Sequence, residues 1–132
     1  MTNPHTVAVD GTVFTGTAGQ NIDNLAVLTA GLDRLALLQR TYEWRHMAPS
    51  APDTLGCFPT DDRDRLVLGA DGVPLPDVYF AGNQPAFATR LAEDPHTRTR
   101  VRLVLVPDFA RTGTAVLVDT ATRAVRTLTV SL

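Results

Sequence analysis

A short apolar run that ends in a polar turn is the feature that most constrains how this chain folds. Val78 to Ala81 has the composition of a buried strand, and Gly82-Asn83-Gln84-Pro85 follows it directly. In α/β enzymes, the turn at the carboxyl end of such a strand often carries metal ligands or phosphate-binding groups. Asparagine is a poor ligand for a transition metal, and proline has no side-chain donor or acceptor. The turn therefore has the position of a site without the usual site residues.

Other β-prone runs predict further strands on both sides of this stretch. They cover residues 5–9, 12–15, 101–106, 114–119 and 124–130. Asp10-Gly11 separates the first two runs and is a strong hairpin signal, because glycine adopts positive φ freely. A second hairpin is predicted across residues 120–123. The run at 101–106 is apolar except for Arg102 and predicts a strand that stops at Pro107.

Helical periodicity is clearest between Thr29 and Trp44. Apolar residues recur at three- and four-residue steps and predict one buried helix face, made of Leu25, Leu28, Leu32, Leu35, Leu38 and Tyr42. Thr29 is the expected N-cap of this helix. Just upstream, Asn21 or Asp23 is expected to cap a short helix over residues 25–28.

The remaining segments read as connections. Residues 47–59 contain three prolines and several apolar side chains, which indicates an ordered loop packed against the rest of the domain. Residues 60–76 are charged and predict a solvated connection with a short extended piece at 66–68, and residues 93–99 predict a polar loop. The order of elements favours a layered α/β or α+β domain with one main helix.

Bulk properties exclude several classes of protein. The chain has 132 residues, which suits one domain or part of one, and a net charge of -2, which gives no global attraction to nucleic acid or anionic membranes. No apolar run is long enough to span a bilayer, so we expect no membrane association. The single cysteine, Cys57, excludes an internal disulfide and fits a reducing compartment.

Four side chains could in principle form a metal site: Asp23, His46, Asp53 and Cys57. Their spacing matches no short ligand pattern, so structural hydrogen bonds are the favoured interpretation. Cys57 is expected to be a buried thiol, because its flanks offer no base or cation that would activate it as a nucleophile.

Two further patterns leave alternatives open. Gly16 to Gly19 resembles a fragment of a phosphate-binding loop, but a tight turn is favoured, because the segment lacks the lysine of a P-loop. Basic residues gather in the C-terminal half, namely Arg90, Arg98, Arg100, Arg102, Arg111, Arg123 and Arg126. A solvated face or a protein interface is favoured over a nucleic-acid track, because acidic residues are interspersed and aromatic residues are few.

Several stretches match one protein family in order and spacing. They are TNP at 2–4, GTAGQNID at 16–23, RHMAPSAPDTLGCFP at 45–59, VYFAGNQP at 78–85, VPDF at 106–109 and GTAVLV at 113–118. Together they resemble the C-terminal part of the delta branch of the B-subunit family of eukaryotic DNA polymerases alpha, delta and epsilon. The resemblance covers the chain from residue 2 to its end.

This resemblance implies the C-terminal portion of a calcineurin-like phosphoesterase fold, a β-sandwich flanked by helices. Active relatives of this fold carry Gly-His-X-His at the turn, so Asn83 and Pro85 stand where two histidine ligands would be. The resemblance therefore implies no catalytic residue, no metal and no cofactor. The family residues expected to have structural or interface roles are Gly19, Gln20, Asn21, Asp23, His46, Pro49, Pro52, Asp53, Cys57, Gly82, Asn83 and Pro85.

The implied function is a non-catalytic accessory subunit in nuclear DNA replication. It would link the C-terminal domain of the polymerase delta catalytic subunit to a further regulatory subunit, and it would meet DNA only through the complex. The alternatives are an active metal-dependent phosphodiesterase or nuclease, and a degenerate fragment without a function of its own. Side chains large enough to anchor an interface, or equally to lie in the core, are Tyr42, Trp44, Phe58, Tyr79 and Phe87.

The chain departs from the family in its length. Residues 1–132 are expected to form an incomplete phosphoesterase-like domain, without the oligonucleotide/oligosaccharide-binding domain and the first half of the phosphoesterase domain that precede this region in the family. The incomplete sheet is then expected to have exposed strand edges.

Overall fold

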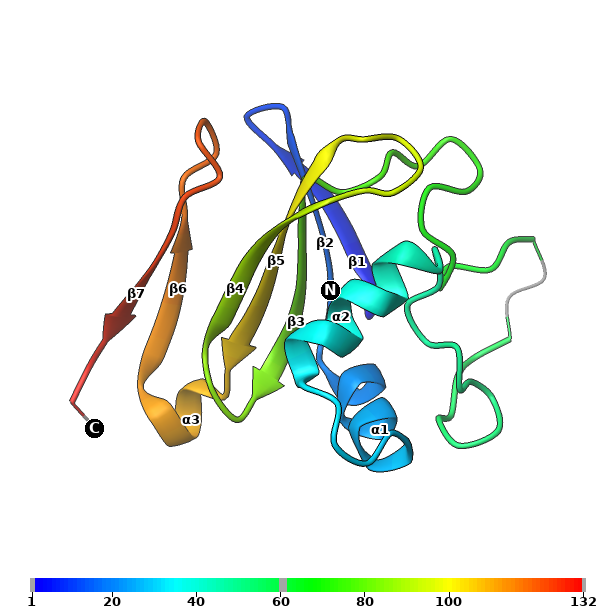
Figure 1. Cartoon of the computed structure of the whole chain (residues 1–132), viewed down its shortest axis with the longest axis horizontal. Coiled ribbons are helices and arrows are strands. Elements are labelled where there is room, and N and C mark those ends of the chain that lie inside the picture. Colours follow the sequence, from blue (N-terminus) through cyan, green and yellow to red (C-terminus); the bar gives the residue numbers. More distant parts are fainter. Residues whose placement is uncertain (1, 60–61, 132) are drawn as a thin grey trace.

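The computed structural model describes residues 2–59 and 62–131, and it contains a mixed sheet, two packed helices and a separate hairpin (Figure 1). Residues 60 and 61 of the predicted charged connection lie outside the described residues. In chain order the elements are β1 (His5–Val9), β2 (Thr12–Thr17), α1 (Gln20–Leu28), α2 (Arg34–Glu43), β3 (Val78–Gln84), β4 (Ala88–Glu93), β5 (Arg100–Pro107), α3 (Phe109–Thr112), β6 (Thr114–Val118) and β7 (Val125–Thr129).

The main sheet has five strands in the order β1-β2-β3-β5-β4. β2, β3 and β5 are parallel, whereas β1 and β4 are antiparallel edge strands. The parallel register places Thr17 beside Ala81, so the carboxyl ends of β2 and β3 lie at the same edge. This mixed architecture confirms the predicted α/β class.

Helices α1 and α2 cover one face of the sheet and enclose the core (Figure 1). Alternate residues of β5 point toward the helices, and Val101 and Leu103 are fully buried there. Tyr79 of β3 is also fully buried, and its hydroxyl group lies 3.0 Å from Thr41 Oγ1 in α2. Val104, on the opposite face of β5, is 1% exposed, so both faces of the strand are buried there and residues 103–106 are all apolar.

The β6–β7 hairpin is the second layer, and polar contacts tie its turn to the main sheet. Thr12 Oγ1 donates to the carbonyl oxygen of Thr120 at 2.8 Å, Arg102 Nε donates to the carbonyl oxygen of Arg123 at 2.9 Å, and Arg123 forms an ion pair with Asp77. Both predicted hairpins are confirmed, because β1 pairs with β2 and β6 pairs with β7, each in antiparallel orientation. β1 has no partner on its outer side among the described strands, and most of its residues are exposed, as expected for an open edge.

The prediction of one long helix from Thr29 to Trp44 is wrong at its start. Thr29 ends α1 instead of capping α2, because its hydroxyl group and its N–H both donate to the carbonyl oxygen of Leu25. Gly31 then adopts a φ of 103°, which reverses the chain. As a consequence, Leu28 and Leu32 are more than half exposed and do not continue the buried face.

Helix α2 begins instead at Arg34, because Asp33 is its N-cap. The Asp33 carboxylate accepts a hydrogen bond from the N–H of Ala36 at 3.3 Å. The helix ends at Glu43, within one residue of the predicted end. The apolar contacts of Leu35 and Leu38 agree with the predicted periodicity.

Strand β4 and the short helix α3 are absent from the sequence-based prediction. β4 has the sequence ATRLAE, whose alanine, arginine and glutamate residues have low β-propensity. It becomes a strand because its backbone pairs along its whole length with residues 100–105 of β5. Residues two apart in β4 share one face, as in any strand. Ala92 is buried in the core beneath the helices, and Arg90, on the same face, donates to Gln39 of α2 at 2.8 Å.

A glycine allows the turn before α1 to pack directly against the end of β3. Gly19 has a φ of 101° and precedes α1, and a Cβ atom built on it would lie 2.0 Å from the carbonyl oxygen of Gly82. A side chain at residue 19 is therefore excluded both by the backbone conformation and by the backbone of β3. This contact fixes the turn between β2 and α1 against the end of β3.

The β4–β5 turn is held by a buried carboxylate. Asp94 is fully buried, forms an ion pair with Arg45 after α2, and accepts hydrogen bonds from the N–H groups of His96 at 2.8 Å and Thr97 at 3.3 Å. Burial acts to raise the pKa of Asp94. The His96 N–H and the Arg45 guanidinium more than offset it, so the pKa lies well below its usual value.

Replacing Asp94 should therefore remove a pH-dependent stabilisation. Because the folded carboxyl has the lower pKa, its contribution is present above the unfolded pKa of about 4 and is lost as the pH falls below it. We expect Asp94→Asn to lower the free energy of unfolding near pH 7 by about 2–4 kcal/mol and to flatten its decrease under acid conditions. Urea unfolding at several pH values measures this. The exposed Asp53→Asn is the control, and equal effects of both variants would contradict the assignment.

Replacing Gly19 should be more damaging than replacing a glycine of similar backbone conformation elsewhere. Gly11 has a φ of 74°, and a Cβ atom on it would meet nothing within 4 Å. Gly11→Ala should cost about 1 kcal/mol, from the left-handed conformation alone. Gly19→Ala adds a backbone clash and should cost about 2 kcal/mol more. Thermal and urea unfolding of the two variants test this, and similar costs would show that the contact with Gly82 yields easily.

Candidate functional site

The predicted polar turn after β3 lies at the carboxyl edge of the parallel strands, but it is not a simple turn. β3 continues beyond Ala81 to Gln84, with a register irregularity between these two residues. Asn83 lies within the irregularity and has a φ of 51°, a conformation that asparagine tolerates better than most residues. The strand prediction is therefore correct in position and three residues short at its end.

The side chains of this segment are engaged in hydrogen bonds. Asn83 Nδ2 donates to the carbonyl oxygen of Ala18 at 2.9 Å, so it links β3 to the turn after β2. Gln84 is fully buried; its Nε2 donates to the carbonyl oxygen of Gly82 at 3.0 Å, and its Oε1 accepts from Arg34 at 3.0 Å. Pro85 is exposed and has no polar side-chain group.

The turn after β2 supplies the other half of this edge. Asn21 is buried in the first turn of α1, where its Oδ1 accepts from Thr17 Oγ1 at 2.7 Å and its Nδ2 donates to the carbonyl oxygen of Met47 at 2.6 Å. Neither Asn21 nor Asp23 caps a helix, because α1 begins earlier and Gly19 occupies the N-cap position. Asp23 instead forms an ion pair with Arg34 of α2.

Hydrogen bonds also oppose the phosphate-loop interpretation of Gly16 to Gly19. The N–H of Ala18 donates to Asn3 Oδ1 at 3.0 Å, and the N–H of Gly19 donates to Thr17 Oγ1 at 3.3 Å. Gly16 lies inside β2, where the Phe80 ring fills the space that its side chain would need. These groups are therefore used by the protein itself, which favours the structural interpretation.

The loop after α2 is anchored at its start and exposed farther along. Met47 and Ala48 are buried, and Asn24 of α1 holds the loop through Ser50 Oγ at 2.6 Å and Thr54 Oγ1 at 2.9 Å. The expectation that the apolar residues of this loop pack against the domain is therefore correct only for its first part. The residues of this loop that the sequence singles out and that are exposed are Pro49, Pro52, Asp53 and Cys57.

The prediction that Cys57 is a buried thiol is wrong. The residue is exposed, and the neighbouring Phe58 is 96% exposed. Apolar composition is misleading here, because in the described part of the chain no helix or strand lies over this end of the loop.

His46 follows α2 and has a defined pair of partners. Its Nδ1 accepts a hydrogen bond from the N–H of Ala48 at 3.2 Å, and its Nε2 lies 3.4 Å from a carboxylate oxygen of Asp64. The predicted metal candidates do not converge, since Asp23 pairs with Arg34 and Asp53 is exposed on the loop. Within residues 2–59 and 62–131, no group of three or more His, Cys, Asp or Glu side chains is placed to hold a metal ion.

A large cavity next to this edge gathers part of the predicted set. It has a volume of about 900 Å³ and lies between the chain start and the loop after α2. The predicted residues that line it are Gln20, Asn21, His46, Pro52 and Cys57. Gly19, Gly82 and Asn83 lie instead in the hydrogen-bonded edge, and Asp23, Pro49, Asp53 and Pro85 do not line the cavity.

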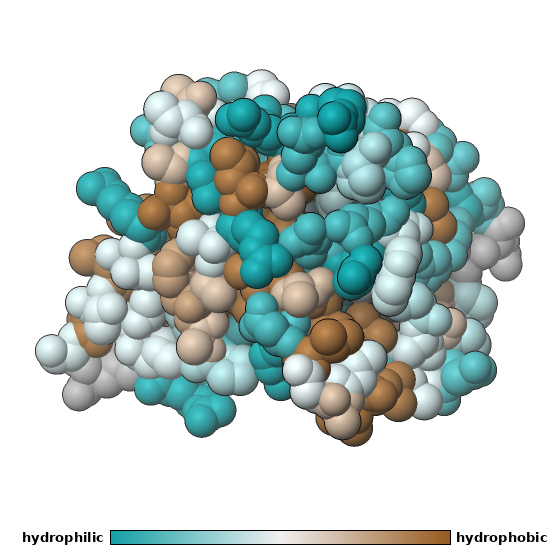
Figure 2. Space-filling model, in the orientation of Figure 1, coloured by the Kyte–Doolittle hydropathy of each residue, from teal (hydrophilic) through white to brown (hydrophobic). Residues whose placement is uncertain are grey.

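The aromatic residues divide between the core and the surface. Tyr42 and Tyr79 are buried, with ring centroids 6.0 Å apart, and Phe87 is half-buried. Trp44 and Phe58 are exposed, and Figure 2 shows apolar patches among hydrophilic surface residues on one face of the molecule. Of the predicted candidates, Trp44 and Phe58 are therefore the ones that remain available to a partner.

Four of the seven arginines named in the C-terminal half have side-chain contacts within the protein, namely Arg90, Arg98, Arg102 and Arg123. Arg98 forms an ion pair with Glu93 at 3.2 Å, Arg90 donates to Gln39, and Arg123 pairs with Asp77. This arrangement favours the solvated-face interpretation over a continuous nucleic-acid track. Across the described residues, no helix is long and apolar enough to span a bilayer.

Sequence reasoning misses two residues that hold the edge together, Arg34 and Gln84. Both are polar residues whose partners lie far away in the sequence, and Arg34 bridges Asp23 and Gln84. Local periodicity contains no signal for such contacts. The unusual polar residue at the end of an apolar strand is the one available hint.

Comparison with known proteins identifies the family of the chain. A model of the B-subunit family of DNA polymerases alpha and epsilon matches residues 1–89, which is about two thirds of the sequence. The DNA polymerase delta small subunit of Arabidopsis thaliana is 42% identical over 130 residues, which cover 98% of this chain and 28% of that protein.

Other curated relatives agree. DNA polymerase delta subunit 2 of Drosophila melanogaster is 40% identical over 119 residues, covering 90% of this chain and 26% of the relative. The DNA polymerase delta small subunit of Saccharomyces cerevisiae is 37% identical over 99 residues, covering 75% of this chain and 19% of the relative. The chain thus spans between 19% and 28% of the length of these relatives. On these matches, the chain belongs to the B-subunit family of DNA polymerases alpha and epsilon.

Proposed function

We propose that this chain acts as part of a non-catalytic accessory subunit of DNA polymerase delta in the nucleus. The relatives named above are small subunits of that polymerase. The observation that carries the proposal is the state of the sheet edge, where Asn21, Asn83 and Gln84 use their side chains to bind the protein's own backbone and neighbouring side chains. These hydrogen bonds fix the backbone at this edge, and a rigid edge suits a subunit whose role is to bind other proteins.

The proposed partners are the C-terminal domain of the catalytic subunit and a further regulatory subunit, with DNA reached only through the complex. Exposed apolar groups support a protein-binding role, because a solvated surface gains nothing from side chains such as Trp44, at 57% exposed, and Phe58. Aromatic residues are frequent anchors of protein interfaces.

We also propose that residues 1–132 correspond to the C-terminal part of an inactive phosphoesterase-like domain. The resemblance at the turn after β3 suggests this, with Asn83 and Pro85 at the positions of two histidine ligands. The open edge of β1 and the two-stranded β6–β7 sheet are consistent with a larger sandwich, because isolated hairpins are marginally stable. A cooperative urea transition of the isolated chain would argue against the alternative of a degenerate fragment.

Co-purification tests the accessory role. An affinity tag on the native polypeptide that carries this sequence should recover the catalytic subunit of polymerase delta from cells of the same organism. Recovery should persist after nuclease treatment, because the proposed contact is between proteins. A matched control is the same polypeptide with Tyr79→Ser, which removes a fully buried core residue and should lose the partner together with the fold. Absence of the catalytic subunit from the unmodified sample would contradict the proposal.

Hydrolysis of bis-p-nitrophenyl phosphate with manganese tests the alternative of an active phosphodiesterase. Two-metal hydrolysis needs ligands that fix both ions, and the amides at this edge are already engaged. We expect no manganese-dependent cleavage above that of a mock purification, and no change in His46→Ala or Asp53→Ala. Cleavage that either substitution abolishes would instead establish a metal-dependent enzyme.

A further inference from the structure

Two neighbouring cavities lie beside the start of the chain. The larger has a volume of about 900 Å³ and the smaller about 460 Å³. They share the lining residues Thr2, Pro4, Met47, Asp64 and Arg65, so they adjoin each other. We call the combined space the β1 groove. One wall is the extended segment from Thr2 to Thr6, and the other consists of the loops that precede β3.

The larger part of the β1 groove has apolar walls. Ala51, Pro52, Leu55 and Phe58 line it, and each of these side chains is exposed or half-buried. Phe58, at 96% exposed, is covered by no other described residue to any useful extent. This part of the groove can therefore gain free energy by burying an apolar side chain of a partner.

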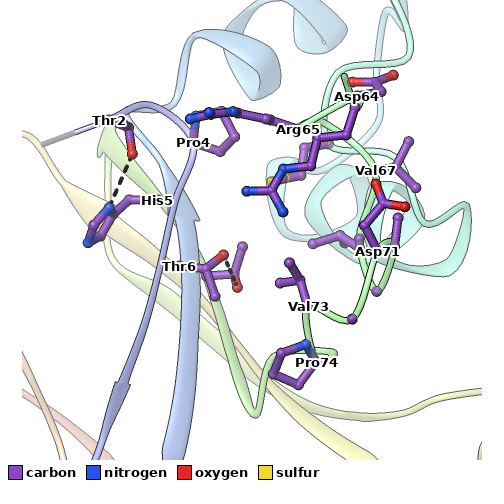
Figure 3. Close-up of a pocket in the computed structure, with 17 residues that line it drawn as sticks. Thr2, Pro4, His5, Thr6, Asp64, Arg65, Val67, Asp71, Val73 and Pro74 are labelled. Atoms are coloured by element: carbon purple, nitrogen blue, oxygen red, sulfur yellow. Dashed lines mark hydrogen bonds between the residues drawn. The ribbon is translucent and has the colours of Figure 1, made fainter. Parts of the chain in front are cut away.

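The smaller part is lined by Arg63 and Arg65, and Arg65 forms no ion pair among the described residues. Figure 3 shows the Arg65 side chain extending into this cavity toward the segment that carries Thr2 and His5. Within residues 2–59 and 62–131, no side chain forms an ion pair or a hydrogen bond with the Arg65 guanidinium. By contrast, Arg34, Arg45 and Arg123 all pair with carboxylates.

The acidic residues near Arg65 are placed beside it without pairing with it. Asp64 is occupied by His46 Nε2 at 3.4 Å and by the N–H of Leu66 at 2.9 Å. Asp71 lines the same cavity, and among the described residues it forms no ion pair with Arg65. Arg63 and Arg65 line this cavity together with Asp64 and Asp71, so its formal charges balance and it offers little attraction to a polyanion such as a nucleic acid, while a single carboxylate can approach Arg65.

We propose that the β1 groove binds an extended segment of a partner protein that presents an apolar side chain to the larger part and an acidic side chain to Arg65. Two adjoining cavities, one with apolar walls and one lined by Arg65, suit two side chains of an extended peptide, and the charge of Arg65 sets the preference for an acidic residue. The proposal deepens the accessory role proposed above and rests on it, since it names the chemistry of a contact that such a subunit would make.

An array of synthetic extended peptides tests this directly on the full chain. The peptides vary one position among acidic, phosphorylated, neutral and lysine residues, and a second position among leucine, phenylalanine and serine. We expect retention of the labelled chain on peptides that combine an acidic and an apolar residue. Fluorescence polarisation of the strongest peptide then gives the dissociation constant for each variant.

The variants separate charge, apolar contact and folding. Arg65→Glu should weaken binding about fivefold or more, because it replaces attraction with repulsion, and Arg65→Lys should retain most of the affinity. Asp71→Asn should strengthen binding by removing a nearby negative charge. Phe58→Ser should weaken it with no change in thermal unfolding. Arg111→Glu, at an exposed residue of α3 that lines neither cavity, is the matched control and should bind like the unmodified chain.

Several outcomes would overturn the proposal. One is an array with no preference for acidic residues, and another is equal binding by Arg65→Glu and Arg111→Glu. A third is displacement of the peptide by inorganic phosphate alone at comparable concentrations, which would indicate a simple anion site. Stronger Arg65-dependent binding of a single-stranded oligonucleotide would also overturn it. Because the array contains no polymerase subunit, its failure leaves the accessory role standing, and failed co-purification leaves the groove standing.

Discussion

The close approach of Gly19 to the carbonyl oxygen of Gly82 is the contact on which the rest of this edge depends. It brings the turn before α1 within hydrogen-bonding distance of the irregular end of β3, so that Asn83 can reach Ala18. Gln84 is then buried at the level where Arg34 approaches from α2. A larger residue at position 19 would push the turn after β2 away from the end of β3, and it would displace α1, which begins at that turn.

Sequence patterns predict the parts of the fold that local chemistry determines. Asp10-Gly11 and the apolar run at 101–106 lead to the correct first hairpin and to the strand β5, because their signals lie within a few residues. The break between α1 and α2 escapes prediction because Thr29 and Gly31 act against a continuous apolar periodicity. β4 escapes it for the opposite reason, since its backbone pairing with β5 outweighs the weak propensity of its own residues.

The sequence predicts where the site lies, but only some of the residues that form it. The turn after β3 does lie beside the turn after β2, as the parallel register requires. The sequence does not show that Arg34 closes the network, because its contacts with Asp23 and Gln84 span α1, α2 and β3. The exposure of Cys57 is equally hidden, since composition indicates that a loop is apolar but not whether another segment covers it.

The polar side chains of this edge already form hydrogen bonds within the protein, so a donor among them that turned to a ligand would give up an existing bond. The same hydrogen bonds make the edge a rigid support for the loops beside it. Asn21 illustrates this: its amide holds the carbonyl oxygen of Met47, which lines the groove that contains Arg65. The hydrogen bonds that occupy the sheet edge therefore also fix the wall of a neighbouring surface. There, in the described part of the chain, Arg65 forms no ion pair and apolar groups stay exposed, which are the properties that favour binding of a protein segment.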